Sequence, residues 1–146
     1  MNPSQSPQEY FRLLLLTVVG QAFGAAGYEL DERPVQWAGG QFRLVKSLDS
    51  GLRAFIEFQL LAYLDTEFAA GNPSRFRVTL SRSDGVRRTL SALVVEDFGV
   101  AILPSADHWW TFTDTETLGR ALAEAGHLIV GYGLPWLAGE LTPPLG

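Results

Sequence analysis

Two segments of alternating polar and apolar residues constrain the fold of this chain most strongly. They are residues 54–60, with the sequence AFIEFQL, and residues 75–82, with the sequence RFRVTLSR. Successive side chains of a β-strand point to opposite faces, so each segment predicts a strand with one apolar and one polar face. The predicted inner face consists of Ile56, Phe58, Leu60, Phe76, Val78 and Leu80. We therefore expect a sheet with one side in the core and one side polar.

Three further strands are predicted around this pair, at residues 28–32, 41–46 and 108–112. The turn residues Asp49-Ser50-Gly51 separate 41–46 from the strand at 54–60, which predicts an antiparallel pairing of these two. In the segment 108–112, Trp110 and Phe112 are expected to point to the same side.

A capping box, Ser6-Pro7-Gln8-Glu9, predicts a helix near the start of the chain. This helix is expected to run through Phe23 and to end in a left-handed conformation at Gly24 or Gly27. Four consecutive leucines at 13–16 point around the whole circumference of this helix, so the turn that they form has no polar side. The helix is therefore expected either to be covered on several sides within the domain or to form a homodimer interface.

A second capping box at 113–116 predicts the last helix, whose apolar stripe extends to Tyr132. The segment 133–137 is expected to be extended. Residues 87–98 are ambiguous, because Asp84-Gly85 is typical of a tight hairpin with its return strand in this segment. The alternative is a helix, which we favour, since one helical face would hold Leu90, Leu93, Val94 and Phe98.

Length and composition place these elements in one domain. The 146 residues, 47% hydrophobic and 18% charged, are enough for a single core. We predict one α+β domain over residues 1–146, with an antiparallel sheet of four to five strands and an N-terminal and a C-terminal helix packed on one face.

The net charge of -5 argues against nucleic acid as the partner, because nucleic-acid binding depends on neutralising phosphates.

The apolar segment 13–26 imitates a signal peptide, but Glu9 offsets Arg12, the only basic residue ahead of it. A cytoplasmic protein is therefore the prediction. Arg12 and Gln21 leave too few uninterrupted apolar residues between them to cross a bilayer, so no membrane association is expected.

The order of these elements resembles a family of uncharacterised bacterial α+β domains. In that family an I-x-F-Q strand leads to an F-x-V-x-L strand, a tryptophan-bearing strand and a final helix. The matching segments here are 56–59, 76–80, 108–110 and the helix from Thr115. Some of these domains are loosely similar to immunity or antitoxin proteins, and this resemblance implies a protein partner. Its motifs are structural and imply no active site.

The sequence predicts no catalytic residues. His108 follows Asp107 near Ser105, which suggests a hydrolase, but adjacent residues on an extended chain point apart and no G-x-S-x-G motif surrounds a serine. We therefore interpret His108 as a residue that ends a turn. Neither H-E-x-x-H nor a calcium-loop spacing occurs, so we predict no metal and no cofactor. A non-enzymatic role is favoured.

The polar face of the predicted sheet is the leading candidate site. Its binding residues are predicted to be Phe55, Glu57, Gln59, Arg75, Arg77, Thr79 and Trp109. Aromatic and arginine side chains on a surface are typical of interface cores, so this face predicts a protein-interaction module. Segment 75–88 holds five arginines against one acid. A cross-strand pairing of Glu57 with Arg77 is expected to account for part of this charge.

The alternative is a small enzyme or a small-molecule-binding protein with a pocket between sheet and helices. Four residues would build that pocket: Tyr63, His108, Trp110 and Trp136. An apolar cleft with a few convergent polar groups is the feature that this alternative requires.

Overall fold

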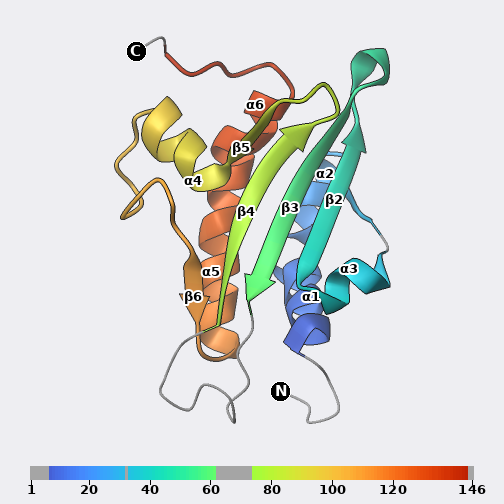
Figure 1. Cartoon of the computed structure of the whole chain (residues 1–146), viewed down its shortest axis with the longest axis vertical. Helices are drawn as coiled ribbons and strands as arrows, with labels where there is room; N and C mark the ends of the chain where they lie inside the picture. The colour runs from blue at the N-terminus through green and yellow to red at the C-terminus, as the bar shows by residue number, and fades with distance from the viewer. Residues whose placement is uncertain (1–6, 32, 62–73, 145–146) are drawn as a thin grey trace.

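An antiparallel sheet built on the two alternating segments is the centre of the computed structural model, which describes residues 7–31, 33–61 and 74–144 (Figure 1). The central strands are β2 (Gln41–Ser47), β3 (Arg53–Leu61) and β4 (Ser74–Arg82). The short strands β1 (Glu29–Leu30), β5 (Arg87–Thr89) and β6 (Trp110–Phe112) complete the sheet. The strand order is β1-β2-β3-β4-β5, and β6 also pairs with β4, so the expected α+β fold with an antiparallel sheet is confirmed.

The register places the apolar residues of neighbouring strands side by side on one face. Phe42 lies opposite Phe58, which lies opposite Val78, and Ile56 lies opposite Leu80. Behind this face Figure 1 shows α1 (Pro7–Val18), α2 (Gly20–Ala25), α5 (Thr115–Leu128) and α6 (Leu134–Leu137). The helices cover this apolar face of the sheet, so the five strand residues just named are almost fully buried. The opposite face of β2, β3 and β4, which we call the outer face, has no covering helix among the described residues.

The N-terminal helix is shorter than predicted. It begins at Pro7 and ends at Val18, and α2 follows after a break at Val19 (φ -119°, ψ -8°) instead of one helix running through Phe23. The buried Val19 lies against Gly126 of α5, and the break lets the second helix place Phe23 in the core. Gly27, with φ +95°, has the expected left-handed conformation. The cap residue Ser6 lies outside the described residues.

The ambiguous segment 87–98 contains both predicted alternatives, first a short return strand and then helical turns. Arg82 and Val86 close a hairpin turn, with Gly85 at φ +97°, and β5 returns along β4 for three residues. The strand then ends because the Thr89 side chain accepts a hydrogen bond from the Ala92 backbone and so caps α4 (Leu90–Ala92). A π-helical turn, η2 (Leu93–Asp97), follows. The predicted helical face is buried at Leu90, Leu93 and Val94.

The last helix differs from the prediction at both ends. Its N-cap is Asp114, whose carboxylate accepts from the Thr117 backbone, so the capping box lies one residue later than expected. After α5 come the π-helical turn η3 (Ile129–Gly133) and the helix α6. The segment 133–137 is therefore helical, and the prediction of an extended segment was wrong. Pro135 fits there because the first turn of a helix needs no backbone donor.

Candidate functional site

The outer face presents polar side chains in rows that run across three strands. Glu57 of β3 lies between Arg43 of β2 and Thr79 of β4. In the next row Gln59 lies between Gln41 and Arg77, and the Gln41 amide donates to the Gln59 side chain at 3.4 Å. Alternation along each strand forces these side chains outward, since their neighbours in sequence fill the core.

Two arginine–aromatic clusters flank these rows. In the first, which we call the Phe55 cluster, the guanidinium carbons of Arg43 and Arg53 lie 4.7 and 5.3 Å from the Phe55 ring centroid. In the second, the Trp109 cluster, the guanidinium carbons of Arg75 and Arg77 lie 4.7 and 4.8 Å from the Trp109 ring centroid. Such cation–π contacts contribute about 0.5–1 kcal/mol each at exposed sites, and they hold the arginines close to the sheet surface.

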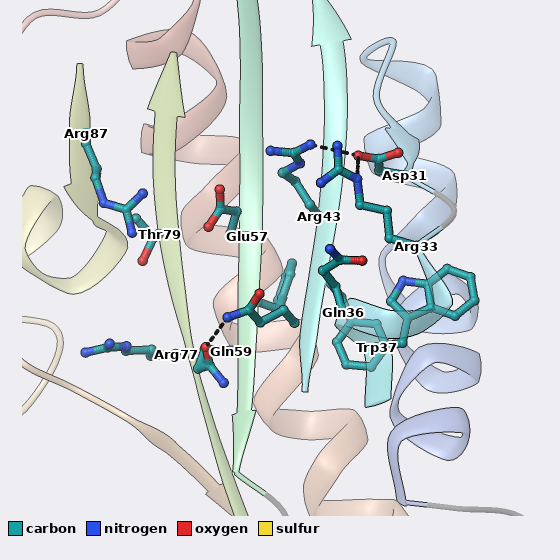
Figure 2. Close-up of a pocket in the computed structure, with 13 residues that line it drawn as sticks. Asp31, Arg33, Gln36, Trp37, Arg43, Glu57, Gln59, Arg77, Thr79 and Arg87 are labelled. Atoms are coloured by element: carbon teal, nitrogen blue, oxygen red, sulfur yellow. Dashed lines mark hydrogen bonds and ion pairs between the residues drawn. The ribbon is translucent and has the colours of Figure 1, made fainter. Parts of the chain in front are cut away.

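A hollow of about 160 Å³ opens on the outer face between the clusters, and we call it the outer hollow. Figure 2 shows Arg77 and Arg87 on one side of Glu57, and Asp31, Arg33 and Arg43 on the other. The further lining residues are Gln36, Trp37, Gln41, Phe42, Phe58, Gln59 and Thr79. The short helix α3 (Pro34–Ala38), beside β2, supplies Gln36 and Trp37. The lining is thus mainly polar, and it comes from the four strands β2 to β5 and from the connection between β1 and β2 that includes α3.

Asp31 organises one rim of the outer hollow. Its Oδ2 accepts from Arg43 at 2.9 Å and pairs with Arg33 at 2.8 Å. The hydrogen bond from Arg43, followed by the charges of Arg33, Arg43 and Arg53, lowers the pKa of the Asp31 carboxyl although partial burial acts against this. Asp31 therefore stays ionised at neutral pH, and Arg33 and Arg43 share its single negative charge.

On the opposite rim the described residues supply no such carboxylate. The register places Thr79 opposite Glu57, and Arg77 lies over Trp109, so the expected Glu57–Arg77 pair does not form. Thr79 is also more buried than a solvent-facing strand residue, at 9% exposure. Within the part of the chain that the structure describes, neither Arg77 nor Arg87 forms an ion pair.

All seven predicted binding residues lie on the outer face or at its edge. The structure gathers Glu57, Gln59, Arg77 and Thr79 around the outer hollow and places the remaining three in the two clusters. The prediction missed Gln41 and Arg43, although their alternation with Phe42 and Leu44 is a signal that could have identified them. Arg33, Gln36 and Trp37 lie in a connection without periodicity, so no local pattern would have placed them on this rim.

The residues of the alternative pocket are only partly brought together. Trp110 is buried in the core, stacked on Phe76 at 5.6 Å, and its indole donates to Glu124 at 3.1 Å. The His108 ring meets the Trp110 ring edge-on at 4.7 Å, and burial lowers the pKa of His108. Trp136 lies half-buried in α6, and Tyr63 lies outside the described residues. The space beside His108, where the alternative would need a pocket, is therefore filled by the Trp110 indole.

Neither metal chemistry nor a membrane span is indicated by the residues that the structure places. Among them no three acidic or histidine side chains are grouped as a metal would need. None of the helices in the described ranges has the length and apolar character needed to cross a bilayer. The comparisons with protein-family models, curated proteins and solved structures gave no match.

Proposed function

We propose that this protein is a non-enzymatic protein-interaction module that binds its partner through the outer face. The observation that carries the proposal is the pair of arginine–aromatic clusters on either side of a sheet face that no helix in the described ranges covers (Figure 1). The resemblance to immunity-like bacterial domains, which bind proteins, agrees with it.

Interface energetics support this reading of the clusters. Arginine, tryptophan and tyrosine are enriched at the few positions that dominate binding, and aromatic residues are enriched in interface cores. Phe55 and Trp109 are both only partly buried, so a partner surface can still cover them. Their arginines are held in place by the rings before binding, which reduces the side-chain entropy lost when a partner docks.

The proposal is tested by removing one residue from each cluster. The double variant Phe55→Ala/Arg77→Ala is compared with the wild type in cross-linking capture from an extract of the organism that makes the protein. A matched control is Leu13→Ala/Arg120→Ala, which removes an exposed apolar residue and an exposed arginine from the helical side. We expect the outer-face variant to lose affinity for a captured partner by about 30-fold or more, as at other interface hot spots.

Circular dichroism and a melting curve establish that both variants are folded. Capture of the same partner with unchanged affinity by Phe55→Ala/Arg77→Ala would show that the outer face is not the binding surface. Equal losses in both double variants would also contradict the proposal, since the effect would then not depend on the face.

A further inference from the structure

The outer face is cationic although the chain as a whole is acidic. Six arginines lie on it or at its rim: Arg33, Arg43, Arg53, Arg75, Arg77 and Arg87. Among the described residues, three acids share this side of the sheet by alternation or as lining of the hollow: Glu29, Asp31 and Glu57. Six positive against three negative charges give +3, and since the chain carries -5, the remainder carries -8. The outer face is therefore a positive surface on a negative body.

Two of these arginines, Arg77 and Arg87, lie on one rim of the outer hollow and have no carboxylate partner in the described ranges. Arg33 and Arg43 share Asp31, as described above. Arg77 contacts the Trp109 ring but no carboxylate, and the exposed Arg87 has no carboxylate partner in the described ranges. Both side chains line the same hollow (Figure 2). Two guanidinium groups are thus available to an incoming anion without breaking an existing ion pair.

Hydrogen-bond donors are also in excess at this face. The Nε atoms of Arg43 and Arg75 are buried and have no hydrogen-bond partner among the residues that the structure describes. Both belong to the arginine–aromatic clusters, one to each. A guanidinium group only donates, so the arginines of the outer face need hydrogen-bond acceptors. A carboxylate supplies two acceptor oxygens and one negative charge, and it pairs with arginine in bidentate geometry.

Resting on the function proposed above, we propose that the partner presents an acidic segment whose carboxylates bind Arg77 and Arg87 in the outer hollow. Arg87 lies opposite Ser81, which is four residues along β4 from Arg77. Four strand residues span about 13 Å, so an extended acidic segment that crosses the hollow reaches both arginines with two carboxylates. The clusters pack against the apolar parts of the same segment.

The geometry favours protein over nucleic acid as the source of these negative charges. Glu57 lies between the two rims of the hollow and repels a phosphate backbone, whereas the carboxylates of a peptide are on flexible side chains that can turn away from it. Trp109 has two guanidinium groups over its ring, and Phe55 has two as well, so these rings are not bare platforms for stacked bases. The negative charge of the remaining surface further opposes a polyanion.

The test is a nuclear magnetic resonance titration of the full chain with hexaglutamate, acetylated and amidated at its ends. Hexaglutamine and single-stranded oligothymidine are titrated in parallel. The matched variants are Arg87→Gln, which removes a charge from the hollow, and Arg120→Gln, which removes one from the exposed face of α5. We expect hexaglutamate to shift the amide signals of β4 and β5, with affinity at least about fivefold lower in Arg87→Gln and nearly unchanged in Arg120→Gln.

Three results would overturn the acidic-segment proposal: equal effects of the two variants, equal binding of hexaglutamine, or tighter binding of oligothymidine. Capture of the cellular partner is then measured with Arg87→Gln and over a range of salt concentrations. A partner that depends on Phe55 and Arg77 but not on Arg87 or salt would leave the interaction module standing and remove the acidic segment. A partner independent of all three residues would remove the proposed function itself.

Discussion

The contact between Val19 and Gly126 of α5 predicts opposite effects for two glycine-to-alanine substitutions in this helix. A Cβ atom added at Gly126 would lie 2.5 Å from Cγ1 of Val19, which is 5% exposed at the break between α1 and α2. A Cβ atom added at Gly119 would meet nothing within 4 Å. The two glycines lie in the same helix, so they share the gain in helix propensity but not the steric clash.

The magnitudes follow from these distances. Alanine stabilises a helix interior by about 1 kcal/mol relative to glycine, and overpacking a rigid contact costs about 1–3 kcal/mol. We therefore expect Gly119→Ala to raise the free energy of unfolding by about 1 kcal/mol, and Gly126→Ala to lower it by about 1 kcal/mol. For a chain of this size the melting temperatures of the two variants should differ by about 6 °C.

The assay is urea unfolding followed by tryptophan fluorescence and by circular dichroism, completed as a cycle with Val19→Ala. Alanine at position 19 has no Cγ1, so Gly126→Ala should stabilise the Val19→Ala background by about 1 kcal/mol, as at Gly119. The coupling free energy should thus be about 2 kcal/mol. Stabilisation by Gly126→Ala in the wild-type background, or a coupling below about 0.5 kcal/mol, would refute the close approach of these helices.

Three further predictions concern the sheet and the core. Gly40 has φ +83°, and a Cβ there would lie 2.3 Å from the Leu60 carbonyl oxygen, so Gly40→Ala should cost more than about 2 kcal/mol in urea unfolding. Burial raises the pKa of Tyr28 from 10.0 to about 12, so the contribution of Tyr28 to stability should be constant below pH 10 and fall between pH 10 and 12, by at most about 3 kcal/mol; a Tyr28→Phe variant should not show this fall. Glu124→Ala leaves the buried Trp110 indole without its acceptor and should cost about 1–3 kcal/mol, whereas retention of full stability would show that the bond is dispensable.

The sequence predicted the centre of the fold because that information is local. Alternation at 54–60 and 75–82 gave strands that the structure extends by only one residue at most at each end. The helical spacing of Leu90, Leu93 and Val94 likewise identified a buried face. Weak elements were predicted less well: the first strand comprises only Glu29–Leu30, and the expected extended segment at 133–137 is helical. Short elements depend on their tertiary neighbours, which no local pattern encodes.

For the candidate site, too, the sequence predicted one part and the tertiary structure decided the other. Periodicity alone assigned Phe55, Glu57, Gln59, Arg75, Arg77 and Thr79 to one polar face, because a pleated strand alternates with a fixed period of two. Only the tertiary structure decided the partners within that face. Strand register placed Thr79 opposite Glu57, and the packing of β6 against β4 brought Trp109 beneath Arg75 and Arg77.

The sequence by itself thus determined which side chains leave the core, whereas the tertiary structure decided which of their charges are neutralised. The α3 connection brings Arg33 and Asp31 to the rim beside Arg43, and the β4–β5 hairpin brings Arg87 to the opposite rim. The Asp31–Arg43 contact joins residues that are 12 positions apart in the chain, across the α3 connection. The geometry of these contacts depends on register and on loop paths. Within the described ranges it leaves Arg77 and Arg87 without a carboxylate on a face where Arg33 and Arg43 share one.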